Sequence, residues 1–370
     1  MRVLDADFMV VGDGLAGAVL TWLLRADGAV VRLFPGDPAR AASRVAAGVL
    51  NPVTGKRLAA GWEVEAQLAS AFSVYGQMEA ELGVSVLRRV PLHRFFLHPS
   101  EEVFHAKRLE DTRYRAFLSG VRSSEEPLGG FVQPRGFFTI SGAGHLEIPP
   151  LLDALSHSHA EAGCVEAAPF SYARLDRSGP GLIYDGRIRA KAVVFCEGIG
   201  VLENPWFGSL RFRPVKGEAL TFTSPELQLP EAVFHHEKWL LPTSNGRFRM
   251  GSTYDRGISL GEGHRKLRAD AFSPSTDGEA ELRGSLPKMF HTPPSMHIVE
   301  HKAGVRPATR DRFPYAGPHP EDARLLVFNG LGSKGALLAP WIASRLVRFL
   351  RHGERIPEPL RPERFGLTPI

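Results

Sequence analysis

The stretch that most constrains this chain is residues 7–34, which read as an apolar run, a glycine-rich turn, an amphipathic segment and a second apolar run. This order is typical of a strand, helix and strand unit. Gly12, Gly14 and Gly17 have the GxGxxG spacing of a dinucleotide-binding turn. In such a turn the first glycine permits the bend, the second admits a pyrophosphate, and the third lets the helix pack on the strand. We therefore predict a nucleotide-binding unit here, with a turn that binds nothing as the less favoured interpretation.

The second strand of this unit departs from the usual pattern. An acidic residue normally ends it, about 20 residues after the glycines, and holds a ribose. Here the apolar run at 30–34 continues into Pro35 and Gly36, and only then comes Asp37. Either Asp37 reaches back or backbone groups replace the acid, so the departure affects the adenosine end of the site and not the fold.

The composition bounds the class of protein. With 370 residues, 43% hydrophobic and 23% charged, the chain suits two interleaved globular domains. No run approaches the ~18 apolar residues of a membrane span, and the first strand begins too early to leave room for a secretion signal. We expect a cytoplasmic protein without a membrane partner. Cys164 and Cys196 are too few for a disulfide framework and are expected to be buried, free thiols.

The charge balance has two interpretations. A net charge of +5 and a pI near 9.3 are compatible with an acidic partner such as nucleic acid. The basic residues are scattered, however, and an arginine-rich composition often reflects genome bias. Both interpretations stay open.

The rest of the chain alternates between two patterns. Residues 39–57 combine small residues with apolar ones, which favours backbone packed against a flat ligand over a flexible loop. Residues 60–83 have helical periodicity, and the apolar strand at 192–198 ends in Gly198, where we expect it to stop near a cofactor. Short strands dominate two excursions, with a hairpin at Asn245-Gly246. The nucleotide-binding domain is expected at 1–83, 142–205 and 301–370, and the second domain at 84–141 and 206–300.

The last helix follows a second glycine turn, GLGSKG, at 330–335. Its first N–H groups are therefore placed to stabilise negative charge. His93, His98 and His105 lack metal-ligand spacing, and no Ser/His/Asp or Cys/His arrangement stands out. We predict no metal site.

These segments together carry a resemblance. VGDGLAG, SRVAAGVL, GAGHLEIPPLL, AVVFCEG, RPVKGEAL, GRFRMGST, GVRPATRDRFPYAG and GLGSKGALLAP occur in this order and span nearly the whole chain. The chain resembles the D-amino-acid oxidase superfamily of flavoproteins, most closely glycine oxidase and the oxidase half of the bifunctional enzyme that matures 5-methylaminomethyl-2-thiouridine in tRNA. The resemblance implies an α/β fold in which a Rossmann-like FAD-binding domain is interleaved with a mainly antiparallel β substrate domain.

The resemblance also implies a set of FAD contacts. In relatives, the first glycine turn binds the pyrophosphate, a segment after the second strand passes beside the isoalloxazine ring, and the C-terminal turn lies against the pyrimidine-like end. The residue that matches Phe170 packs near the adenine through its backbone. The other matching residues are Gly12, Gly14, Leu15, Ala16 and Gly17; Ser43, Arg44, Ala47, Gly48 and Val49; and Leu331, Gly332, Ser333, Lys334, Gly335, Ala336 and Leu337.

Two residues are expected on the substrate side of the flavin. Arg306, in GVRP, is similar to the arginine that pairs with the substrate carboxylate in relatives, a task that suits its planar fork. The structural alternative is an ion pair of Arg306 with Asp311 or Glu300. Tyr254 lies where relatives line the substrate side, with packing inside its sheet as the alternative.

Three functions follow from the resemblance. The first is an oxidase of amino acids or N-alkyl amino acids that passes hydride to flavin, with dioxygen as the expected acceptor. The second is a tRNA oxidase acting on a carboxymethylaminomethyl group. The GLGSKG turn and the basic pI favour this second function, whereas the RPATRDRFPYAG segment looks closer to glycine oxidase. The third is a flavin-binding partner subunit without catalysis. No cysteine follows Cys196, so FAD is expected to be non-covalent; the substrate and the oligomeric state are left open.

Overall fold

The computed structural model describes residues 3–123, 125, 128–258 and 266–365. Its larger part is built on a five-stranded sheet in which four neighbouring strands are parallel and the edge strand β20 is antiparallel. The order across this sheet is β3 (Val31–Phe34), β2 (Phe8–Val11), β14 (Ala192–Phe195), β21 (Leu325–Asn329) and β20 (Tyr315–Pro318). The predicted first strand, turn, helix and second strand are all present.

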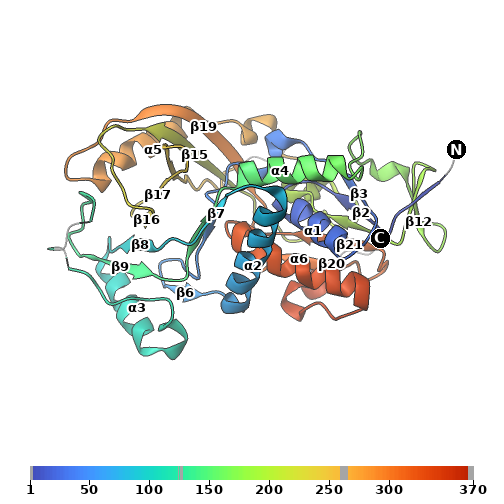
Figure 1. Cartoon of the computed structure of the whole chain (residues 1–370), viewed down its shortest axis with the longest axis horizontal. Helices are drawn as coiled ribbons and strands as arrows, with labels where there is room; N and C mark the ends of the chain where they lie inside the picture. Colours follow the sequence, from blue (N-terminus) through green and yellow to red (C-terminus); the bar gives the residue numbers. More distant parts are fainter. Residues whose placement is uncertain (1–2, 124, 126–127, 259–265, 366–370) are drawn as a thin grey trace.

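Helices cover one face of this sheet (Figure 1). Phe8 and Val10 of β2 point into this helical layer, whereas Met9 and Val11 point to the other face. Both faces are buried, which explains the continuous apolar runs in the sequence. The helices of the layer are α1 (Leu15–Ala26), α2 (Val64–Leu82), α4 (Ile148–Glu161) and α6 (Gly335–His352).

A small sheet covers the opposite face. It is a meander of β11 (Leu175–Asp176), β12 (Leu182–Tyr184) and β13 (Ile188–Ala190), with β1 (Leu4–Asp5) parallel to β13. Aromatic rings fill the space between the two sheets. Cys164 and Cys196 are buried and free, which confirms the prediction for both.

The second part of the molecule is a seven-stranded sheet, seen with α5 at the left of Figure 1. Every neighbouring pair is antiparallel except β16 and β8, so the predicted mixed α/β fold with a mainly antiparallel second sheet is confirmed. Asn245-Gly246 lies in the hairpin between two of its strands, with Gly246 at φ 74°. The order is β19 (His297–Arg306), β15 (Val215–Thr223), β18 (Phe248–Gly251), β17 (Trp239–Pro242), β16 (Val233–His235), β8 (Leu92–Phe95) and β9 (Phe137–Ile140).

Two helices were not predicted. Mainly strands were expected in these regions, whereas α3 (Pro99–Glu110) and α5 (Thr276–Met289) are helical. The helix α3 buries only Glu101 and His105, so it has no apolar stripe to detect, and a capping box between His98 and Glu101 starts it. The helix α5 is polar on average and contains Pro287, which weakens its signal.

Short strands connect the two parts. One three-stranded sheet contains β4 (Val49–Leu50), β10 (Gly144–Leu146) and β7 (Leu87–Arg88), and β5 (Val53–Thr54) pairs with β6 (Ala59–Ala60). The long strand β19 ends at Arg306 and carries the GVRP segment to the boundary between the two parts. In the described part of the chain, no helix is long and apolar enough to cross a membrane.

Candidate functional site

The first glycine turn is too tight for side chains. Gly12 has φ 97°, and a Cβ atom there would lie 2.5 Å from the Cys196 carbonyl oxygen. A Cβ atom on Gly17 would lie 1.8 Å from the Gly12 carbonyl oxygen. The missing side chains therefore let α1 begin directly against the ends of β2 and β14.

The N-terminus of α1 is open to an anion. Its N-cap is Gly14, which supplies no side-chain cap, and its first turn holds no acidic residue. The Leu15 N–H donates to Ser43 Oγ at 3.3 Å. The N–H groups of the first turn, which includes Ala16 and Gly17, carry the positive end of the helix dipole.

The segment that contains Ser43 lies between the two large sheets. A Cβ atom on Gly304 of β19 would lie 3.2 Å from a Val45 methyl carbon, and one on Gly48 would lie 1.9 Å from the Leu146 carbonyl oxygen. The segment is thus closely packed against β19 and β10 and is not a flexible loop, whereas the predicted packing against a flat ligand stays a prediction. Arg44 points away from it to Asp153, at 2.8 Å, Ala47 is half-buried, and Val49 begins β4.

Arg249 holds this segment to the second sheet. Its guanidinium donates to the Val45 carbonyl at 2.8 Å and to the Ala46 carbonyl at 3.1 Å, and it lies 5.9 Å from the Trp239 ring. Burial lowers the pKa of Arg249. Arg249 was not predicted as a site residue, although alternation along β18 places it on the face opposite the buried Phe248.

Arg306 ends β19 with an unused donor. Its Nη2 donates to Ser252 Oγ at 2.7 Å, while Nη1 is buried without a hydrogen-bond partner within the described residues. Burial lowers its pKa. Gly217 makes room for the guanidinium, because a Cβ atom there would lie 2.1 Å from Nη2.

The structural alternative for Arg306 is contradicted. Asp311 is paired with Arg364 at 2.8 Å, and Glu300 is paired with Lys302 at 2.7 Å. Neither carboxylate forms an ion pair with Arg306 in the described structure. A buried cation with a free donor is costly without an acidic partner, so this position is suited to a ligand anion.

Tyr254 lies beside this cation. It follows the end of β18, and 57% of its surface is exposed, so the alternative that it packs inside its sheet is wrong. Its ring lies 5.8 Å from the Arg306 guanidinium carbon and 5.2 Å from that of Arg256. Tyr254 and Arg256 form an exposed rim next to the buried Nη1 of Arg306.

The second glycine turn brings α6 next to α1. A Cβ atom on Gly335 would lie 3.7 Å from a Leu15 methyl carbon, so the N-termini of the two helices are neighbours. Burial, with Arg312 nearby, lowers the pKa of Lys334. Gly332 has φ 56°, a backbone conformation that favours glycine. The other predicted residues of this turn and helix start are Leu331, Ser333, Ala336 and Leu337, of which Ala336 and Leu337 are buried.

Gly198 and Phe170 lie at the carboxyl end of the same sheet. The Gly198 carbonyl accepts from Asn329 Nδ2 at 2.7 Å, which ties the end of β14 to the strand before the second glycine turn. The Phe170 ring packs in the aromatic layer, 5.1 Å from Phe34 and 4.7 Å from Tyr184.

Glu197 is a further residue that the sequence analysis missed. It is half-buried and accepts hydrogen bonds from the Tyr172 hydroxyl and from Asn204 Nδ2. Burial raises its pKa to about 7. Its Cα atom would lie 3.4 Å from a Cβ atom on Gly12, so the backbone of Glu197 borders the first glycine turn.

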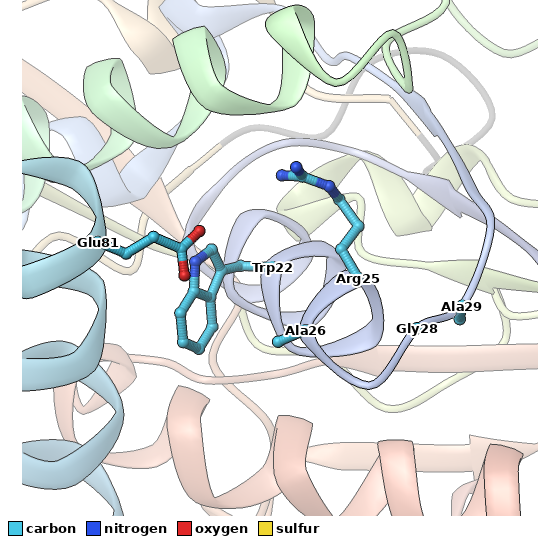
Figure 2. A pocket seen from close by; sticks show the side chains of 6 residues that line it. All are labelled: Trp22, Arg25, Ala26, Gly28, Ala29 and Glu81. Carbon is cyan, nitrogen blue, oxygen red and sulfur yellow. The ribbon is translucent and has the colours of Figure 1, made fainter.

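A separate hollow of about 330 Å³ lies at the other end of α1 (Figure 2). The helix α1 has 12 residues and is about 18 Å long. The hollow at its C-terminal end is therefore remote from the glycine turn at its N-terminal end. Arg25 extends toward α4, where it contacts His159 Nδ1 at 2.9 Å. The residues that line the hollow are Trp22, Arg25, Ala26, Gly28, Ala29 and Glu81. No group of three or more His, Cys, Asp or Glu side chains suited to a metal is found among the described residues.

Comparison with protein families decides the identity of the chain. Residues 7–348 match the model of the DAO family, described as FAD dependent oxidoreductase. The chain belongs to this family. Its cofactor is FAD, and its class is that of FAD-dependent oxidoreductases. The predicted family and cofactor are confirmed.

Individual relatives agree with the family. The chain is 30% identical to a glycine oxidase of Bacillus licheniformis over 54% of this chain and 47% of that protein. It is 28% identical to the tRNA 5-methylaminomethyl-2-thiouridine biosynthesis bifunctional protein MnmC of Caulobacter sp. (strain K31), over 96% of this chain and 57% of that protein. The matches thus span about half the length of these curated relatives.

Solved structures confirm the fold. Glycine oxidase from Geobacillus kaustophilus superimposes with a TM-score of 0.81 at 22% identity, covering 98% of this chain and 99% of that one. Iminodiacetate oxidase from Chelativorans sp. BNC1 gives a TM-score of 0.75 at 19% identity, covering 96% and 98%. The fold of this family member is therefore that of DAO-type flavoenzymes.

The residues present fit FAD. Side chains at Gly12 and Gly17 would collide with backbone, and two neighbouring helix N-termini, at α1 and α6, face the carboxyl end of the sheet. A dinucleotide with a pyrophosphate and an electron-accepting ring matches this donor set.

Proposed function

We propose that this protein oxidises the C–N bond of a small amino acid or N-alkyl amino acid, with Arg306 binding the substrate carboxylate and dioxygen accepting the electrons. The observation that carries the proposal is the buried Nη1 atom of Arg306, which has no partner in the described residues. A carboxylate would supply the missing acceptor and the compensating charge in one group.

We assign FAD to the residues that the family resemblance implies. The two glycine turns and the packed segment between the sheets support this assignment. Because no cysteine follows Cys196, we propose that FAD is not covalently attached, and acid precipitation should release it into the supernatant. The assigned residues are Gly12, Gly14, Leu15, Ala16, Gly17, Ser43, Arg44, Ala47, Gly48, Val49, Phe170, Gly198, Leu331, Gly332, Ser333, Lys334, Gly335, Ala336 and Leu337.

The chain's own residues have a limited task in this reaction. FAD, when bound, supplies the oxidising chemistry by accepting a hydride from the carbon next to an amine. Arg306 would fix the carboxylate end of the substrate, and its bond to Ser252 orients the guanidinium plane. A fixed carboxylate restricts the position of the adjacent carbon. Binding energy thereby contributes to catalysis by holding the substrate in the orientation that hydride transfer needs. Tyr254 would form one wall of the opening.

A second candidate function is oxidation of a carboxymethylaminomethyl group on a tRNA wobble base. That group is chemically a glycine carried on a nucleotide, so Arg306 would bind it in the same way. The exposed rim of Tyr254 and Arg256 favours this candidate, because it leaves the carboxylate position open to a large substrate with a phosphate backbone. The relation to MnmC over 96% of the chain points in the same direction.

A third candidate is a flavin-binding partner subunit without catalysis. It is the weakest, because a buried arginine with a free donor has no evident purpose in a protein that binds only the cofactor. Its expected signature is a flavin that no amine or tRNA reduces.

The test is anaerobic bleaching of the flavin absorbance. The purified protein is mixed with glycine, sarcosine, D-amino acids, proline or undermodified tRNA. We expect rapid bleaching by one of the free amino acids, followed by recolouring and peroxide release in air. Bleaching by tRNA alone would move the function to wobble-base modification, and no bleaching by any of these would support the partner subunit.

A further inference from the structure

We propose that Asp13, inside the first glycine turn, binds the adenosine ribose hydroxyls of FAD in place of an acidic residue at the end of β3. The proposal rests on the FAD cofactor alone and not on the identity of the substrate. It concerns the one position where this chain departs from the usual dinucleotide-binding pattern.

The end of β3 offers no carboxylate of its own. The strand stops at Phe34, and Pro35 follows it. Asp37 is exposed, and its Oδ1 accepts from the Ala39 N–H at 2.9 Å, which caps the short helix Pro38–Arg40. One oxygen of the first acid after the strand is therefore used by its own turn, and the side chain is exposed to solvent.

Asp13 reaches the same place from the other side. Its Oδ1 accepts from the Gly36 N–H at 2.9 Å, so the carboxylate sits directly against the residues that follow β3. The Gly12 N–H also donates to the Phe34 carbonyl at 2.8 Å. Two hydrogen bonds thus hold the glycine turn beside the strand end.

The geometry leaves one carboxylate oxygen for a ligand. Asp13 is half-buried, and its Oδ2 has no hydrogen-bond partner among the residues the structure describes. A Cβ atom on Gly36 would lie 3.6 Å from Asp13 Oδ1, so the residue that bonds this carboxylate has no side chain to cover it. In a dinucleotide-binding unit the ribose lies over this strand end.

The chemistry suits a vicinal diol. A ribose offers neighbouring hydroxyl donors, and a carboxylate is an acceptor that forms charge-assisted hydrogen bonds with them. The other nearby acid, Glu197, already accepts hydrogen bonds on both of its oxygens, from Tyr172 and Asn204. Among the nearby acids, Asp13 is therefore the half-buried carboxylate that keeps an oxygen free, whereas Asp37 is exposed and caps its own turn.

The competing explanation is that Asp13 only fastens the turn to Gly36. Asp13→Asn separates the two roles, because the amide oxygen still accepts from the Gly36 N–H while the charge is lost. Asp37→Asn is the matched control, since it neutralises the neighbouring acid that caps its own turn.

The experiment compares FAD with its 2′-deoxyadenosine analogue. Both are titrated into the deflavinated full-length protein, with flavin fluorescence giving Kd and near-UV circular dichroism confirming the fold. Wild-type protein should bind FAD at least about tenfold more tightly than the analogue. Asp13→Asn should lose most of that preference and bind FAD at least about tenfold more weakly, whereas Asp37→Asn should match wild type.

Several results would overturn the proposal. Equal affinity of the wild-type protein for FAD and its analogue would do so without any variant. So would an Asp13→Asn protein that keeps the wild-type preference, which would leave Asp13 a structural residue. Loss of the preference in Asp37→Asn would assign the ribose to Asp37.

Discussion

A buried charge without a partner is the most informative feature at the scale of single residues. Arg306 keeps one donor unused within the described residues, although both acids predicted as its alternatives are close in sequence and are paired elsewhere. Desolvating a guanidinium is expensive, and a role in binding an anionic ligand explains that cost better than packing does.

Replacing Arg306 should weaken the binding of carboxylate substrates and leave FAD bound. In Arg306→Ala we expect kcat/KM for a carboxylate substrate to fall about 100-fold or more, because two charge-assisted hydrogen bonds are lost. Arg306→Lys should recover part of the loss, and the exposed neighbour Arg310→Ala serves as the control. Flavin content is measured from the absorbance of each protein. A flavin-free Arg306→Ala protein would show that the residue is structural.

Glu197 should give the apoprotein a measurable pH dependence of stability. Burial raises its pKa to about 7 from an ordinary value of 4.5, so the native state binds the proton more tightly than the unfolded state. Stability from this group is therefore complete below pH 4.5 and is lost as the pH rises to about 7.

The expected loss from Glu197 is about 1–3 kcal/mol, reduced by its partial exposure. Glu197→Gln should remove this slope, which is measured as the difference in melting temperature from wild type at pH 5, 6, 7 and 8. The exposed Glu81→Gln is the control. Parallel curves for wild type and Glu197→Gln would contradict the prediction.

At the scale of elements, the glycine turn determines how close α1 comes to the sheet. The Gly17 position faces the Gly12 carbonyl across a gap that no Cβ atom fits. A Cβ atom on Gly76, in the middle of α2, would meet nothing within 4 Å outside its chain neighbours and the backbone of its own helix. The two helical glycines therefore differ only in their surroundings.

Alanine at these two glycines should have opposite effects. Gly17→Ala should destabilise the protein by at least about 2 kcal/mol and remove bound FAD, since α1 must move away from β2. Gly76→Ala should be neutral or stabilise by about 0.5–1 kcal/mol, because alanine is the better helix former. Urea unfolding and flavin content measure both. Retained FAD in Gly17→Ala would contradict the close packing.

Some helices and strands could be predicted from the sequence, and others could not. The strands and helices around the glycine turn have long apolar runs or clear stripes, and their positions were predicted within a few residues. The helix α3 was not predicted, because the side chains that it buries are two polar ones. Asp13 was missed because its partner, Gly36, becomes a neighbour only through the ends of the parallel strands β2 and β3. Glu197 was missed because its raised pKa comes from burial, which the sequence does not show.

At the scale of the whole molecule, the segment around Ser43 to Gly48 joins the two large sheets. It packs against Gly304 of β19 and is held by the Arg249 guanidinium of β18. The family resemblance places the flavin ring beside this segment. We therefore expect the second sheet to support the cofactor site through this segment.

Removing the Arg249 guanidinium should lower the affinity of the protein for FAD. In Arg249→Met the Val45 and Ala46 carbonyls lose a charged donor, and we expect the Kd of FAD to rise about tenfold. Arg247→Met, on the exposed hairpin of the same sheet, should leave it unchanged. Fluorescence titration of deflavinated proteins measures both. An unchanged Kd in Arg249→Met would show that the segment holds its position without this link.

The strand order of the five-stranded sheet also constrains how the protein is made. The central strand β14 pairs with β2 on one side and with β21 on the other, so neighbouring strands come from the beginning, middle and end of the chain. Such pairings between distant segments slow folding. During synthesis β2 must wait for partners that emerge much later, and its four apolar residues stay unprotected until then. Yield on expression should therefore depend on chaperones and on growth temperature more than the stability of the finished protein would suggest.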